Sequence, residues 1–74
     1  MDNKEIRQIR IDKGLTQKQM AQLLMCNIET VRRYEWGWNK PRQIYADLLT
    51  RVKSGEMDAQ IEAMKNAVEI PQTV

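Results

Sequence analysis

Two closely spaced helix starts constrain this chain more than any other feature of its sequence. Thr16 is followed three residues later by Gln19, a capping box that predicts a helix beginning at Gln17. Asn27 is the next candidate N-cap, and the apolar and aromatic residues after it recur at helical spacing. The link between the two helices is only Met25-Cys26-Asn27. Because so short a link fixes the angle between two helices, the stretch predicts a helix-turn-helix unit.

Glycine and proline residues mark where the other helices end. Gly14 and Gly37 are expected to close the helices before them, because glycine tolerates the left-handed backbone at a helix C-terminus. Ser54-Gly55 separates two further helices, and Pro71 stops the last one, so residues 70–74 should fray. The sequence has no alternating β-branched run. We therefore expect an all-α fold with five helices, near residues 4–13, 17–24, 28–36, 41–53 and 56–69.

Composition excludes several classes of protein. The 74 residues leave room for one small domain, without an apolar run that could span a membrane and with a polar, charged N-terminus unlike a signal peptide. One cysteine cannot form an internal disulfide, and without histidine there is no plausible zinc set. A single serine and the absence of a phosphate-binding glycine loop give an enzyme almost no support. We expect a cytoplasmic protein without metal or cofactor.

The net charge of +2 is unevenly distributed along the chain. Residues 1–53 carry 11 Lys and Arg against 6 Asp and Glu, a net charge of +5. Residues 54–74 carry one Lys against four acidic residues, a net charge of −3. A basic unit joined to an acidic tail is the footprint expected of a phosphate-binding surface, although charged residues can also serve solubility alone.

The ordered pattern of apolar, polar and glycine positions resembles the lambda-repressor-like (Cro/CI, or XRE) helix-turn-helix DNA-binding family. The matching residues are Ile6-x-x-Ile9-Arg10, Gly14-Leu15-Thr16-Gln17, Met20-Ala21-x-x-Leu24 and Thr30-Val31-x-x-Tyr34-Glu35-x-Gly37-x-x-x-Pro41. The resemblance covers residues 5 to about 53 and implies a compact five-helix fold that binds double-stranded DNA. It assigns residues 1–54 to the DNA-binding domain and leaves 55–69 as a separate amphipathic helix.

The resemblance also implies which residues contact DNA. The helix at 28–36 would enter the major groove, where arginine suits guanine and glutamate accepts from cytosine. Arg33 is the first candidate for reading bases and Glu29 the second, and Arg32 could instead hold a phosphate. The full set of expected base contacts is Ile28, Glu29, Thr30, Arg32 and Arg33. The expected contacts to the DNA backbone are Gln17, Lys18, Asn27, Trp38, Asn39, Lys40 and Arg42.

Three further positions carry expectations of another kind. In the family, the positions of Arg10 and Glu35 form an ion pair that ties the first helix to the third, and both residue types match here. The family usually has glycine in the turn, where this chain has Met25. A left-handed backbone is costly for a residue with a Cβ, so either the turn differs or it carries local strain. Trp36 and Trp38 are harder to place: one is expected to cover the edge of the core, and the other to lie against the sugar-phosphate backbone or a partner.

The last helix carries one apolar seam, formed by Met57, Ile61, Met64 and Val68. The seam could join two copies of the chain, as a reader of palindromic DNA requires, or pack on the fourth helix of its own chain. Both could hold at once.

Two functions fit these features. The first is a sequence-specific transcriptional regulator, a dimeric repressor on an inverted-repeat operator. The second is the antitoxin of a toxin-antitoxin pair, which binds a partner protein and represses its own operon. The chain's small size, with little beyond the DNA-binding unit, is typical of regulators from phages, plasmids and related operons.

Overall fold

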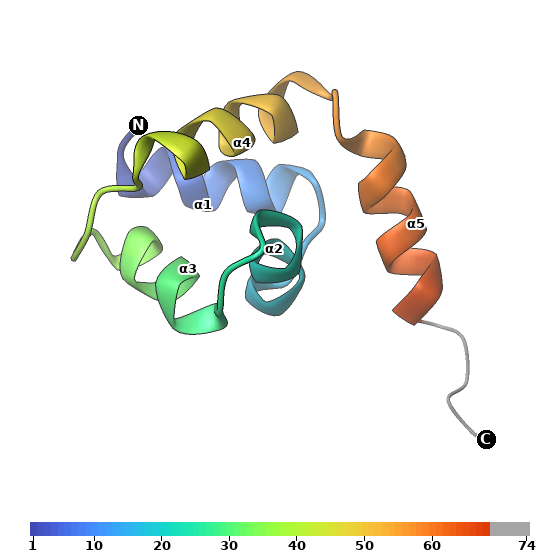
Figure 1. Ribbon diagram of the computed structural model, residues 1–74, viewed down its shortest axis with the longest axis horizontal. Coiled ribbons are helices and arrows are strands. Elements are labelled where there is room, and N and C mark those ends of the chain that lie inside the picture. Colours follow the sequence, from blue (N-terminus) through green and yellow to red (C-terminus); the bar gives the residue numbers. More distant parts are fainter. Residues whose placement is uncertain (69–74) are drawn as a thin grey trace.

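The computed structural model describes residues 1–68 of the chain, and this part contains five α-helices and no β-strand (Figure 1). The helices are α1 (Asn3–Asp12), α2 (Gln17–Leu24), α3 (Ile28–Trp36), α4 (Gln43–Ser54) and α5 (Asp58–Val68). The expected all-α class is confirmed. The predicted tail at 70–74, Glu69 and the side chain of Val68 lie outside the described part of the structure.

The two helix starts form as the capping residues predict. The Gln19 backbone N–H donates to Thr16 Oγ1 at 3.0 Å, and the Thr16 N–H donates to Gln19 Oε1 at 2.9 Å. This reciprocal capping box begins α2. Asn27 begins α3, because its Oδ1 accepts from the Thr30 N–H at 3.1 Å.

A residue with left-handed backbone directly follows α2, α3 and α4, and one lies two residues after the end of α1. Gly14, Gly37 and Gly55 serve α1, α3 and α4, with φ of 69°, 81° and 94°. At the end of α2 this conformation falls on Met25, with φ 59° and ψ 41°. Of the two expected alternatives, a different turn or local strain, the structure has the second. The Met25 N–H donates to the Gln22 carbonyl oxygen and the Cys26 N–H to that of Ala21, as at a glycine C-cap. Met25 therefore carries backbone strain that a glycine would avoid.

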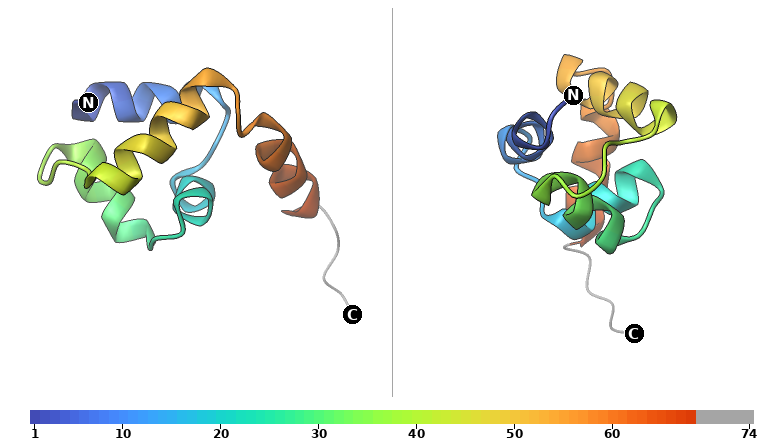
Figure 2. Two further views of the ribbon diagram at one scale, coloured as in Figure 1. Left: turned by 45° about the horizontal axis from the view of Figure 1, so that its top comes forward. Right: turned by 90° about the vertical axis from the view of Figure 1, so that its left-hand side faces the viewer.

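Helices α1, α2, α3 and α4 are arranged around a common centre (Figures 1 and 2). Their buried apolar side chains form one core cluster. Each helix buries its apolar stripe there, as helical spacing predicts. The most completely buried side chains are Ile6, Met20, Leu24, Val31, Leu49 and Val52.

Helix α5 packs beside this core rather than standing free of it. Ile61 is only 5% exposed and belongs to the core cluster, and Met57 and Met64 pack against it partly buried. Polar contacts hold the helix as well: Lys65 Nζ donates to the Lys13 carbonyl oxygen at 2.7 Å, and Lys13 Nζ pairs with Asp58. Ile61 was expected at a dimer interface, but burial in its own chain makes it unavailable to a second copy. The seam packs on its own core at this position because α5 turns away from the end of α4 and runs beside α2 (Figure 1), with an open hollow lined by residues of all three helices.

One ion pair joins the first helix to the third. Arg10 Nε and Nη2 donate to the two carboxylate oxygens of Glu35 at 2.7 and 3.1 Å, and Arg10 Nη1 donates to the Leu15 carbonyl at 3.0 Å. The Glu35 side chain is 3% exposed and that of Arg10 16%. A fork-to-fork pair at this depth fixes the distance and the angle between α1 and α3.

Replacing Met25 with glycine is expected to stabilise the fold. The free energy of unfolding of the Met25→Gly variant should be about 1 kcal/mol higher than that of the Met25→Ala variant. The reason is that alanine keeps the strain of the left-handed backbone and glycine removes it. Urea denaturation of the two variants measures the difference. Equal midpoints would show that the turn is unstrained.

Breaking the Arg10–Glu35 pair is expected to destabilise the fold severely. Arg10→Ala or Glu35→Ala leaves a buried charge without its partner, which typically costs about 3–5 kcal/mol. The matched control is Lys53→Ala, which breaks the exposed pair between Lys53 and Glu5 and should cost under about 1 kcal/mol. If the Arg10 variant melts like the parent but binds DNA poorly, the pair belongs to the binding surface and not to the architecture.

Candidate nucleic-acid interface

The first turn of α3 presents a mixed set of side chains, of which some are exposed and some are held by the protein. Glu29 is exposed and pairs with Arg32 through a 2.8 Å contact between Oε1 and Nη1. Ile28 packs partly against the core, and Thr30 is half-buried with its hydroxyl 3.4 Å from Asn27 Oδ1. The expected base-contacting positions therefore differ in how readily they could reach a base edge.

The two consecutive arginines have different surroundings. Arg32 is half-buried and donates from Nε to Gln17 Oε1 at 3.4 Å, in addition to its pair with Glu29. Arg33 is exposed and forms no ion pair or side-chain hydrogen bond with the described residues. Its guanidinium is thus the one of the two that can meet a ligand without first giving up an intramolecular contact.

Gln17 connects the ion pair at the centre of the fold to the surface of α3. Its Nε2 donates to Glu35 Oε1 at 3.3 Å, and its Oε1 accepts from Arg32. The resulting chain of contacts runs from Arg10 through Glu35 and Gln17 to Arg32 and fixes α2 against α3. The side chain of Gln17, which was expected to contact a phosphate, is therefore bonded within the protein. The backbone N–H groups of residues 17 and 18 belong to the first turn of α2, where N–H groups have no partner inside the helix.

An open hollow of about 670 Å³ lies between the outer side of α3, the loop after it and the start of α4. Three cationic residues line it, Arg33, Lys40 and Arg42, and no acidic residue does. Its other lining residues are Thr30, Tyr34, Trp38, Asn39 and Tyr45. The hollow has the charge and the hydrogen-bond donors that a phosphodiester backbone requires.

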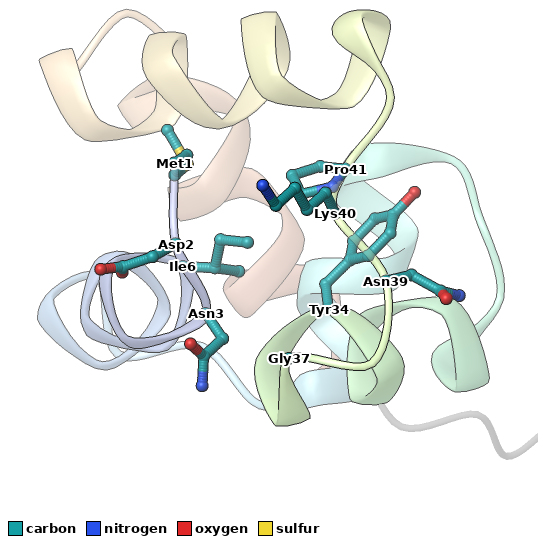
Figure 3. Close-up of a pocket in the computed structure, with 9 residues that line it drawn as sticks. All are labelled: Met1, Asp2, Asn3, Ile6, Tyr34, Gly37, Asn39, Lys40 and Pro41. Atoms are coloured by element: carbon teal, nitrogen blue, oxygen red, sulfur yellow. The ribbon is translucent and has the colours of Figure 1, made fainter.

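Lys40 also borders a second, smaller hollow of about 260 Å³, between the loop and the start of α1 (Figure 3). In Figure 3 the Lys40 amine points across this hollow, while the Asn39 amide points to the other side of the loop. The two residues expected at the DNA backbone therefore project in different directions from one short segment. Both are exposed, as is Arg42.

Asn27 and Lys18 lie at the ends of the two helices of the motif. Both side chains are exposed, and the oxygen of Asn27 is already used in capping α3. Lys18 follows the capped N-terminus of α2, where a positive side chain and free N–H groups attract an anion.

The two tryptophans form one exposed aromatic pair. The rings of Trp36 and Trp38 have centroids 5.3 Å apart and planes inclined by 56°. Both side chains are more than half exposed. The expectation that one of them covers the core edge is wrong: the core is closed at this end by Tyr34, which packs against Tyr45 at 6.1 Å.

Sequence reasoning missed Tyr45 as a lining residue of the cationic hollow. Pro41 and the first turn of α4 return the chain toward α3, which brings Tyr45 beside Thr30 and Arg33. The sequence did contain a signal: Tyr45 lies four residues after Pro41 and four residues before the buried Leu49, and so on the same face of α4 as Leu49.

The acidic part of the chain lies away from this surface. Figures 1 and 2 both place α5 at the opposite end of the molecule from the loop between α3 and α4.

Cys26, in the turn between α2 and α3, is half-buried, and burial raises the pKa of its thiol. A raised pKa keeps the thiol protonated at neutral pH and argues against a redox role for it.

Comparison with known proteins agrees with this geometry. A family model described as helix-turn-helix matches residues 6–52, which is more than half of the chain. Searches of curated proteins and of solved structures gave no match. In the described part of the chain, no helix has the length and apolar character needed to cross a membrane. The match covers the ion pair, both helices of the motif and the cationic hollow, and the chain therefore belongs to the lambda-repressor-like (XRE) helix-turn-helix family of DNA-binding transcriptional regulators.

Proposed function

We propose that this regulator is a repressor that binds an inverted-repeat operator as a homodimer, with α3 in the major groove of each half-site. The observation that carries the proposal is the exposed Arg33 beside a hollow bordered by Lys40 and Arg42. A base-reading arginine and a set of phosphate-binding cations then act on adjacent parts of the same duplex.

The division of labour between the arginines follows from their contacts. Arg33 is the principal base reader, because bidentate binding to guanine requires a guanidinium free to turn toward the base edge. Arg32 is held by Gln17 and Glu29, so its role is to orient Glu29 and to present positive charge to the nearest phosphate. Ile28 and Thr30 offer apolar contact to a thymine methyl group from the same turn.

The contacts to the DNA backbone come from the segments on either side of α3. Lys18 and the N-terminal N–H groups of α2 bind a phosphate on one side, together with Asn27. Asn39, Lys40 and Arg42 bind phosphates on the other side, and Trp38 lies against the sugar. Repression in this proposal comes from occupation of a promoter that contains the operator.

A homodimer supplies the second reading helix. An inverted repeat places two half-sites about one helical turn apart, roughly 34 Å, and a two-fold axis in the protein matches it. Met57 and Met64, which α5 leaves partly exposed beside α4, remain available for such an interface, whereas Ile61 does not.

Removing the Arg33 side chain tests base reading. Arg33→Ala should cost about 1–3 kcal/mol at the preferred site and relax the base preference at one position. The preferred site comes from selection on a random duplex pool, and fluorescence anisotropy gives the affinities. Unchanged affinity with intact helical content would assign base reading to another element.

Removing Lys40 or Arg42 tests phosphate binding. Either alanine variant should weaken binding to all sequences alike and reduce the slope of log K against log salt by about one unit. Lys53→Ala is the matched control, because this substitution removes the same charge from another face of the protein. Lys53 is on α4 and pairs there with Glu5 of α1. Equal slopes for Lys40, Arg42 and Lys53 variants would count against a phosphate contact.

A further inference from the structure

Helix α4 exposes a large apolar side chain that none of residues 1–66 covers. Ile44 is 65% exposed, although Leu49 and Val52 on the same helix are fully buried. Helical periodicity places Ile44, Asp47, Leu48 and Arg51 on one stripe, beside the face that enters the core. Along the stripe an apolar residue is followed twice by a charged one: Ile44 by Asp47, and Leu48 by Arg51.

The far end of this stripe borders an apolar hollow of about 480 Å³ between α2, α4 and α5. Five apolar residues line it, together with two glutamines and one arginine: Leu23, Met25, Leu48, Met57, Met64, Gln22, Gln60 and Arg51. The α5 wall is fixed in place by the buried Ile61 and by the contact of Lys65 with the Lys13 carbonyl. A protruding isoleucine and a hollow of matching character thus lie on the same face of one helix.

We propose that a second copy of this chain covers this face, with the two α4 helices antiparallel about a two-fold axis near Leu48. In that arrangement Ile44 lies opposite the partner's Arg51, whose neighbouring hollow receives the isoleucine side chain. The two-fold axis repeats the contact, so each copy gives one isoleucine and accepts one. This inference rests on the proposed homodimer and assigns its principal contact to α4, with Met57 and Met64 in a supporting position.

The charges of the stripe are complementary to themselves under the same symmetry. Asp47 precedes Arg51 by one helical turn, so antiparallel packing brings each Asp47 within reach of the partner's Arg51. Within residues 1–68 Arg51 forms no ion pair, and Asp47 accepts only a hydrogen bond from Gln43 Nε2 at 2.8 Å. The stem of the partner's Arg51 covers Ile44 while its guanidinium meets Asp47.

Two other features favour this occupant. Arg42 and Tyr45 at the start of α4 line the cationic hollow with Arg33, so the proposed interface lies on the helix that also borders the candidate DNA surface. Met25 is 88% exposed in one chain and held in a strained backbone conformation. Strain of this kind persists where a side chain has a task, and a second copy would cover the flexible methionine.

Charge exchange across the two-fold axis tests the proposal. Asp47→Arg places two arginines opposite each other at both ends of the interface, and Arg51→Asp places two aspartates there. Each variant alone should dimerise at least about tenfold more weakly than the parent, because like charges oppose each other twice. An equimolar mixture of the two variants restores both ion pairs and should form a heterodimer, detected by native mass spectrometry and sedimentation velocity.

The apolar contact is tested without any change of charge. Ile44→Gln should weaken dimerisation at least about tenfold by removing the inserted side chain from both ends of the interface. Ile11→Gln is the matched control, since Ile11 is a 50% exposed isoleucine on α1, and it should dimerise like the parent. Circular dichroism confirms that all variants are folded.

The outcomes separate this inference from the proposed function. A parent that is monomeric at micromolar concentration, charge variants that dimerise like the parent, or a mixture that stays monomeric would each overturn the α4 interface. Binding to a duplex with a single half-site does not need the dimer, and Ile44→Gln should match the parent there. A parent that dimerises as proposed but prefers no DNA sequence would overturn the proposed function and leave the interface standing.

Discussion

The Arg10–Glu35 ion pair is the interaction on which the rest of the structure depends. It joins α1 to α3 across the core, and Gln17 extends it to α2 and to Arg32 on the surface. Three helices that hold few apolar residues each are thereby fixed in one arrangement. A domain of this size has a small core, so polar contacts with defined geometry set the angles that apolar packing leaves free. The orientation of α3 relative to α1 follows from this pair.

Much of the fold could be predicted because the helix ends are encoded locally. The starts of α2 and α3 match the predicted residues, since the capping side chains of Thr16 and Asn27 determine them within four residues of sequence. The start of α4 was placed at 41 but occurs at Gln43, because Arg42 occupies the N-cap without a side-chain cap. The start of α5 was placed at 56 but occurs at Asp58, because the chain needs a turn after Gly55 before it can reverse.

The site was harder to predict than the fold, since its properties depend on contacts between helices. Sequence spacing placed Arg32 and Arg33 on the same turn but could not separate them; the difference arises from Gln17, which lies on another helix. The burial of Ile61 depends on where α5 folds back, and a seam of apolar residues looks alike whether its own chain or another one covers it. The sequence left open which tryptophan would cover the core edge, and both are more than half exposed because they contact each other at the end of α3.

The aromatic residues divide the molecule into two optical regions. The chain has two tryptophans and two tyrosines, and the tryptophans lie together in solvent at the end of α3 while the tyrosines pack together at the core edge. All tryptophan emission therefore originates next to the cationic hollow. Its wavelength and intensity report on what occupies that surface, and only the tyrosine signal reports directly on the packing of the interior. Tryptophan fluorescence recorded during denaturation therefore reports on the end of α3 and the loop after it, and not on the core.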